Sequence, residues 1–122
     1  MFSIRLLPLT KRNADNQRLG ELVVGDFHEN FVCHDWSVNL DGLEAYWRKR
    51  LFALIAGEPV VELQYDSRLA WVIYREKSDC FVQHRFSPDG DFRKLLPRVN
   101  ETEDGTVSEW IMSVLAIEKF LG

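Results

Sequence analysis

The segment HENFVCH, at residues 28–34, brings together the side-chain types that most often bind metal ions in proteins. Its histidines, His28 and His34, stand six positions apart, whereas the zinc-protease motif HExxH needs histidines at i and i+4 on one helix face. In a strand each residue advances about 3.3 Å, so the two side chains would lie roughly 20 Å apart. In a helix, six steps would place them on widely separated faces. The spacing therefore predicts strand or loop histidines and no metal site.

A cysteine beside a histidine can act as a nucleophile, because the histidine takes the proton of the thiol. Cys80 and His84 share one face of a predicted strand, but the four residues of spacing put them roughly 13 Å apart. Cys33 would approach His84 only if their two strands paired. The chain also lacks a Gly-rich phosphate loop, a CxxC pair and a GxSxG motif. We therefore predict that the protein is not an enzyme and uses no cofactor.

Length and charge narrow the class of protein further. The chain has 122 residues, a hydrophobic fraction of 46% and a net charge of −4. This length predicts one domain over residues 1–122, because domains typically have about 100 to 150 residues. The acidic balance argues against nucleic-acid binding, and no apolar run reaches the ~18 residues of a membrane span. We expect a cytoplasmic protein with reduced cysteines that binds neither nucleic acid nor a membrane.

The spacing of apolar residues predicts the elements that carry these side chains. Alternation with a period of two is typical of strands, which we place at residues 2–6, 18–24, 27–33, 60–66, 69–76 and 80–86. A tight turn near Gly25–Asp26 joins the second and third of them, and the polar residues 10–17 form a loop. Glu29 falls on the same side of its strand as Phe27 and Phe31. It must therefore lie at an edge, or a bulge must move it outward.

Residues 41–57 carry the clearest helical pattern. Asp41 is a suitable N-cap and Gly57 a suitable residue just beyond the helix end. Apolar side chains recur at helical spacing between them, at Leu43, Trp47, Leu51 and Leu54. The pattern predicts one amphipathic helix whose apolar stripe packs on a sheet.

The last third of the chain is less regular. Residues 87–98 form a predicted loop, and Asp104–Gly105 is a hairpin signal. Ser113 can cap a short last helix, but a longer helix that begins at Ser108 fits the periodicity equally well. The elements together predict an α+β fold, with a single, mostly antiparallel sheet of about 6–8 strands and two helices packed on it.

Acidic residues concentrate in residues 98–109. One arginine stands there against four acidic side chains, Glu101, Glu103, Asp104 and Glu109, which gives the segment a charge of −3. An acidic hairpin tip attracts a basic partner over long range. A polar loop that only keeps the protein soluble is an equally good interpretation.

Three stretches taken together resemble a known family. They are residues 19–31 (LGELVVGDFHENF), the pairs Trp36–Ser37 and Tyr46–Trp47, and residues 103–110 (EDGTVSEW). The chain is similar in these stretches to immunity proteins of contact-dependent growth inhibition (CDI), which are small bacterial cytosolic proteins. The resemblance implies that the chain binds the toxin domain at the C-terminus of a CDI exoprotein. It also favours a strand over residues 107–112.

Further expectations follow from the resemblance. The toxin is commonly a nuclease, and the immunity protein blocks its active site or its access to substrate without any catalysis. Chemistry alone then suggests the contact residues: an acidic group and a second patch that contains a tryptophan, a favoured interface anchor, namely Glu101, Glu103, Asp104 and Glu109, with Asp35 and Trp36. Trp36 fits the protein core equally well. The alternatives are a small ligand-binding or scaffolding module and, less favoured, a small hydrolase that uses one of the histidines.

Overall fold

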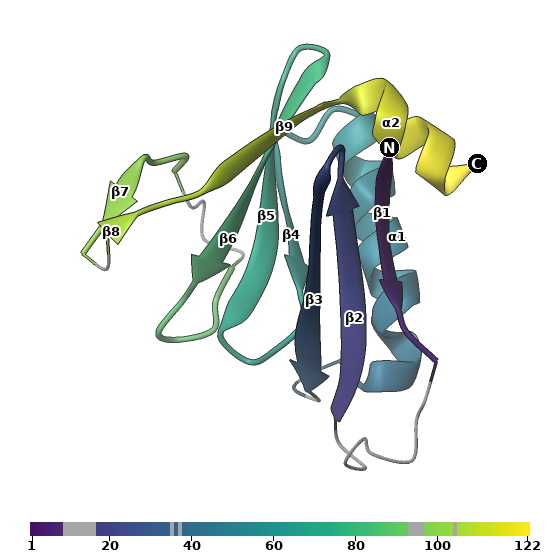
Figure 1. Ribbon diagram of the computed structural model, residues 1–122, viewed down its shortest axis with the longest axis vertical. Helices are drawn as coiled ribbons and strands as arrows, with labels where there is room; N and C mark the ends of the chain where they lie inside the picture. Colours follow the sequence, from purple (N-terminus) through teal and green to yellow (C-terminus); the bar gives the residue numbers. More distant parts are fainter. Residues whose placement is uncertain (9–16, 35, 37, 93–96, 104) are drawn as a thin grey trace.

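A computed structural model describes residues 1–122 except 9–16, 35, 37, 93–96 and 104 (Figure 1). Its elements, in chain order, are β1 (Phe2–Leu6), β2 (Gln17–Val24), β3 (Phe27–His34), the 3-10 turn η1 (Leu40–Gly42), α1 (Leu43–Ile55), β4 (Val60–Gln64), β5 (Leu69–Glu76), β6 (Asp79–Phe86), β7 (Glu101–Thr102), β8 (Gly105–Thr106), β9 (Glu109–Ser113) and α2 (Val114–Leu121). All of the described strand pairs are antiparallel. The predicted α+β class with mostly antiparallel strands is confirmed. Most of the predicted loop at 10–17 lies outside the described residues.

The prediction of a single sheet is wrong. The described strands form a three-stranded sheet in the order β1-β2-β3, a four-stranded sheet in the order β4-β5-β6-β9, and the small hairpin β7–β8. One backbone hydrogen bond, from His34 N to Tyr65 O at 3.0 Å, links the end of β3 to the segment after β4. Elsewhere aromatic rings fill the space between the two sheets. Phe31 packs against Trp71 at 5.7 Å between ring centroids, and Phe27 stacks on Trp110 at 3.8 Å. Rings of this size leave no room for a continuous ladder.

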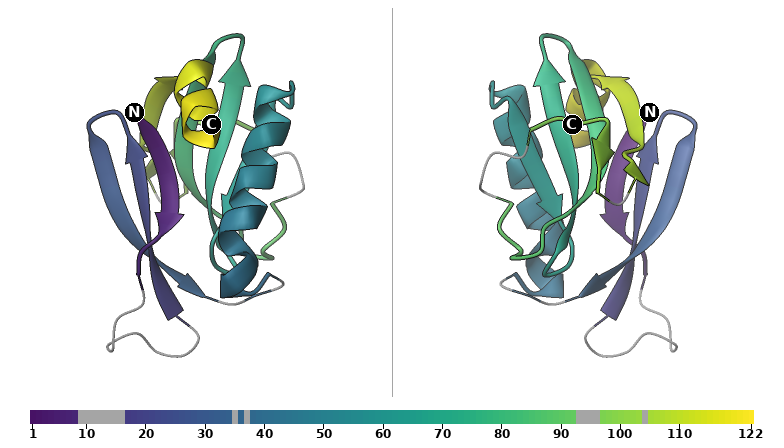
Figure 2. Two further views of the ribbon diagram at one scale, coloured as in Figure 1. Left: turned by 90° about the vertical axis from the view of Figure 1, so that its right-hand side faces the viewer. Right: turned by 90° about the vertical axis from the view of Figure 1, so that its left-hand side faces the viewer.

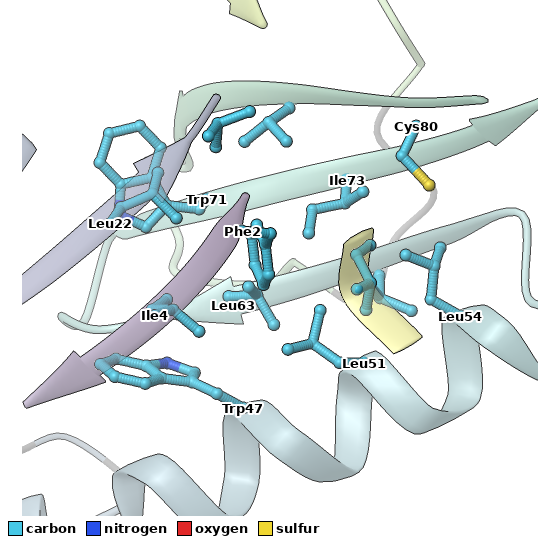
Figure 3. Packing of buried hydrophobic residues seen from close by; sticks show 14 of the residues in the cluster. Phe2, Ile4, Leu22, Trp47, Leu51, Leu54, Leu63, Trp71, Ile73 and Cys80 are labelled. Atoms are coloured by element: carbon cyan, nitrogen blue, oxygen red, sulfur yellow. The ribbon is translucent and has the colours of Figure 1, made fainter. Parts of the chain in front are cut away.

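Helix α1 supplies one wall of the core, as predicted. Its four stripe residues are fully buried: Leu43, Trp47, Leu51 and Leu54. Figure 3 shows Trp47, Leu51 and Leu54 pointing from α1 toward β4 and β1, where Leu63 and Ile4 lie. Burial of each such side chain contributes about 1.5–3 kcal/mol relative to exposure, so this stripe fixes the helix on both sheets.

The start of α1 differs from the prediction, whereas its end agrees with it. Asp41 is not the N-cap, since it lies inside η1, and Gly42 occupies the N-cap position of α1 without a side-chain hydrogen bond. The Asn39 side chain instead accepts a hydrogen bond from Gly42 N at 3.0 Å, which caps the 3-10 turn. Gly57 has φ of +122°, a left-handed conformation that glycine adopts without strain, and it ends the helix as expected.

The last segment is a strand followed by a short helix. β9 pairs with β6, with Met112 opposite Cys80, so the longer helix from Ser108 is wrong and the strand is correct. The Ser113 hydroxyl accepts a hydrogen bond from Ala116 N at 3.3 Å and caps α2. Figure 2 shows α2 lying beside the beginning of β1, at one end of the molecule. Among the described residues, no helix has the length and apolar character needed to cross a bilayer.

Candidate protein-binding surface

The two histidines of HENFVCH lie at opposite ends of β3, as the spacing predicted. His28 Nε2 is 3.0 Å from a carboxylate oxygen of Glu21 on the neighbouring strand. His34 Nδ1 is 2.9 Å from Asp66 Oδ2, and its Nε2 is 2.9 Å from the amide nitrogen of Gln17. No group of three metal-ligating side chains occurs in the part of the chain that the structure describes. Both histidines therefore have local, structural contacts.

The cysteines are buried and protonated. Burial raises the pKa of the Cys33 thiol to about 12 and that of Cys80 to about 11, so neither forms a thiolate near pH 7. His84 is hydrogen bonded to the Tyr65 hydroxyl and not to a thiol. The strands that carry Cys33 and His84 belong to different sheets. This arrangement cannot activate a cysteine nucleophile.

Glu109, one of the four predicted acidic contacts, is engaged inside the molecule. Arg98 donates to both of its carboxylate oxygens, at 2.6 and 2.8 Å, and the Gln83 amide donates at 2.7 Å. The hydrogen bonds from Arg98 hold the pKa of Glu109 below its ordinary value. Glu109 therefore contributes to the surface mainly by fixing the segment around it.

The same arginine attaches the hairpin β7–β8 to the four-stranded sheet. The Arg98 guanidinium lies 3.7 Å from the centre of the Phe81 ring, a cation–π contact. The Gln83 amide donates to Val99 O at 3.0 Å, and Val107 N donates to Asn100 O at 2.8 Å. Figure 1 shows the hairpin projecting away from both larger sheets. Its base is thus held by polar contacts while its tip extends into solvent.

Glu101 and Glu103 lie on this projecting hairpin and are exposed. Asp104, the third predicted contact of the tip, lies outside the described residues. The two described carboxylates form an acidic surface, which we call the hairpin surface. Their exposure is what a charged contact with a partner requires.

The second predicted patch lies elsewhere on the molecule. Trp36 is half-buried and packs edge-to-face on Tyr46 of α1, at 6.2 Å between ring centroids, while Asp35 lies outside the described residues. Trp36 and Tyr46 line a cavity of about 550 Å³ together with Glu62 and Phe92. Neither Glu101 nor Glu103 lines this cavity, so it does not combine the patch with the hairpin surface.

Sequence reasoning missed a second cavity, of about 420 Å³, that adjoins the hairpin. Glu29 of β3, Phe86 of β6 and Trp110 of β9 are among the side chains that line it. β3 has regular register there, with Leu22 opposite Glu29, so no bulge moves the carboxylate outward. Glu29 is exposed on β3, which is an edge strand of the three-stranded sheet, so the predicted edge position is confirmed. The sequence signal was the position of Glu29 on an otherwise apolar strand face.

Comparisons with known proteins bear on the fold. No family model matches the chain, and no curated protein matches it. A solved structure described as "CdiA-CT/CdiI toxin and immunity complex from Enterobacter cloacae" contains a chain that is similar in structure, with a TM-score of 0.77 and 18% sequence identity. The match covers 99% of this chain and 96% of the other. The chain therefore shares the fold of a protein from a CDI toxin and immunity complex along nearly its whole length.

Proposed function

We propose that the chain is an immunity protein that binds a cognate toxin domain, carried at the C-terminus of a CDI exoprotein, and neutralises it. The observation that carries the proposal is the similarity in fold, over 99% of this chain, to a chain of a toxin and immunity complex. The sequence resemblance in residues 19–31 and 103–110 supports the same function independently. Binding covers the toxin's active site or its path to substrate, in the cytoplasm and without catalysis.

The charge of the protein supports a nuclease as the toxin. A nuclease attracts the phosphates of its substrate, so the surface around its active site is basic. This chain has a net charge of −4 and an exposed acidic hairpin. Complementary charges accelerate association and align the two proteins.

We assign contact roles accordingly. Glu101, Glu103 and Asp104 meet basic groups of the toxin, whereas Glu109 positions the hairpin through its pair with Arg98. Asp35 and Trp36 form a second contact patch. Trp36 suits this role because part of its ring is accessible beside the cavity that it lines with Tyr46.

Growth rescue tests the function directly. The C-terminal domain of the exoprotein encoded beside this chain is expressed in bacteria with and without the chain, and the purified pair is titrated by calorimetry. We expect growth arrest by the toxin domain alone, rescue by the chain, and one-to-one binding with a nanomolar Kd. An unrelated immunity protein serves as the control for specificity. Toxicity that persists with the chain present, together with no measurable binding, would contradict the proposal.

The alternative of a small ligand-binding module has one observation in its favour, the cavity of about 550 Å³ beside Trp36 and Tyr46. A ligand that binds only the folded state raises the unfolding temperature. Under this alternative, metabolites stabilise the protein in a thermal-shift screen while the toxin domain does not. Immunity function predicts the reverse result.

A further inference from the structure

The cavity of about 420 Å³ beside the hairpin is built from three parts of the chain that are far apart in sequence. β3 contributes Glu29, the paired strands β5 and β6 contribute Leu69, His84 and Phe86, and the segment from β7 to β9 contributes residues up to Trp110. Because Thr102 and residues 105–108 line it, the cavity adjoins the hairpin β7–β8, which also carries Glu101 and Glu103. A partner bound at the hairpin can therefore reach this opening.

Glu29 is the acidic side chain of the cavity lining. Its carboxylate is exposed at the cavity and has no hydrogen-bond or ion-pair partner among the described residues. Its neighbours on the same face of β3, Phe31 and Cys33, are buried and apolar. The carboxylate thus keeps its full capacity to accept hydrogen bonds in a cavity that Phe86 and Trp110 also line.

Aromatic rings line the cavity around this carboxylate. Phe86 is 51% exposed, an unusual degree of exposure for a phenylalanine that ends a strand of the main sheet. Trp110 is held in place by its stack on Phe27, at 3.8 Å between ring centroids. Ring faces carry partial negative charge and attract cations, most strongly for tryptophan. A ring that is already fixed loses no conformational freedom when a cation binds to it.

The basic groups near the cavity do not neutralise Glu29. Arg85 touches the cavity, but its guanidinium donates to the Tyr74 hydroxyl at 2.8 Å and to Pro97 O at 3.0 Å. His84 is hydrogen bonded to the Tyr65 hydroxyl, and burial lowers its pKa, so the imidazole is neutral at pH 7. The lining therefore contains one carboxylate, Glu29, that no ion pair engages, and one guanidinium, that of Arg85, which neutral acceptors hold in place.

We propose that this cavity receives an arginine side chain of the cognate toxin domain, whose guanidinium pairs with Glu29 and lies against Phe86 and Trp110. The inference rests on the proposed immunity function. Arginine suits the site better than lysine, because its planar guanidinium forms two parallel hydrogen bonds to a carboxylate and stacks on rings. A lysine ammonium is compact and strongly hydrated, so it gains less from aromatic walls. The net charge of −4 favours a basic partner in the same way.

Calorimetric titration of the full chain with the purified toxin domain tests the assignment. The variant is Glu29→Gln, which keeps the shape of the side chain and removes its charge. The matched control is Glu58→Gln, which removes the same charge from an exposed position after α1. We expect Glu29→Gln to raise Kd about tenfold or more, and the control to change it by less than about twofold. Equal unfolding temperatures of the wild type and Glu29→Gln establish that both are folded.

A second arm identifies the partner residue. Each arginine of the toxin's contact face is replaced by alanine and titrated against wild-type chain and Glu29→Gln. One arginine variant of the toxin should bind the wild-type chain more weakly than the unmodified toxin domain does. The same variant should bind Glu29→Gln as tightly as the unmodified toxin domain does, since the pair is already broken. This non-additive pattern would locate the guanidinium at Glu29.

Three results would overturn the assignment, and they separate it from the immunity function. If the wild-type chain does not bind the toxin domain, both ideas fail. If it binds and Glu29→Gln behaves like Glu58→Gln, immunity stands and Glu29 is only an inward charge that prevents strand pairing at the edge of β3. If Phe86→Ala weakens binding while Glu29→Gln does not, the cavity takes an apolar group instead of arginine.

Discussion

Arg98 connects the acidic hairpin to the sheet through two kinds of contact. Its guanidinium forms a two-pronged ion pair with Glu109 and lies over the Phe81 ring. An exposed ion pair contributes little alone, but here a planar group satisfies a carboxylate and a ring face at once. Arg98 therefore acts together with the hydrogen bonds from Gln83 to Val99 and from Val107 to Asn100 to hold the hairpin.

Replacing Arg98 with alanine should loosen the hairpin more than it destabilises the protein. We expect a loss of about 1 kcal/mol in the free energy of unfolding, measured in urea, because the lost contacts with Glu109, Glu76 and the Phe81 ring are partly exposed. Amide exchange in residues 99–107 should accelerate by a larger factor than exchange in β5. Arg98→Lys should recover only part of the effect, since an ammonium cannot form the two-pronged pair. Unchanged exchange at the hairpin in Arg98→Ala would contradict this role.

His84 should make stability depend on pH. Burial lowers its pKa below the ordinary 6.5, and the charge of Glu29 opposes this shift only in part. The unfolded chain therefore takes up a proton before the folded chain does as pH falls below 6.5, so stability decreases toward the lower folded pKa. One such group contributes a slope of at most about 1.4 kcal/mol per pH unit. The full contribution of His84 to the free energy of unfolding is present above pH 6.5.

Unfolding in urea between pH 5 and 8 measures this effect when the wild type is compared with His84→Gln. The difference between their slopes isolates His84 from the other two histidines. The wild type should lose stability faster than the variant below pH 6.5. Parallel curves would show that His84 titrates alike in the folded and unfolded chains.

At the scale of elements, β9 and α2 are joined at one residue. Ser113 is the last residue of the strand and also caps the helix, through the bond that its hydroxyl accepts from Ala116 N. The cap stops the extended chain and starts the helix at the same position. A helix of eight residues has little stability of its own, so both its cap and its buried face matter.

Ser113→Ala should lower the free energy of unfolding by about 1 kcal/mol, because the Ala116 amide loses its hydrogen-bond partner. Ser113→Asp should restore most of this loss, since aspartate is an equally good cap. Chemical denaturation measures both changes, and near-equal stability of the alanine variant would show that the cap contributes little. Circular dichroism should show lower helix content in the alanine variant alone.

The elements with strong periodicity were predictable, and the arrangement of the sheets was not. The stripe from Leu43 to Leu54 repeats at helical spacing, and β5 is apolar on both faces, so each pattern specifies one element. The separation into two sheets depends on how Phe27 and Phe31 pack against rings of other strands. A hydrophobic pattern states which face is buried but not which strand covers it.

The candidate site was predictable in part for a similar reason. The acidity of residues 98–109 is a local property, and the structure places the described carboxylates Glu101 and Glu103 in solvent. The pairing of Glu109 with Arg98 depends on how the segment folds back, and no spacing rule predicts it. Glu29 was visible as a conflict between a charge and an apolar strand face, and its predicted position at an edge agrees with β3 as the edge strand of its sheet.

At the scale of the whole molecule, charge should control how fast the toxin is captured. The double variant Glu101→Lys with Glu103→Lys should slow association with the toxin domain about tenfold at low salt. The control pair, Glu58→Lys with Glu118→Lys, changes the net charge equally at exposed positions away from the hairpin. Stopped-flow association from about 0.01 to 0.15 M salt should show the difference shrinking, because the screening length falls from ~30 to ~8 Å. Equal rates for both double variants would mean that the hairpin does not guide binding.

The order of strands also predicts when, during folding, the cavity beside the hairpin becomes complete. Within the two larger sheets, every described pair joins strands that are consecutive in the chain except β6 with β9. Consecutive pairs close short loops and form quickly, whereas β9 must return across the whole segment after β6. Trp110 and the buried face of α2 take their places when β9 pairs with β6. A chain caught before this pairing would already contain most of its sheets yet lack a wall of the cavity, so under the proposed function a newly made chain would gain its complete binding surface only when β9 docks.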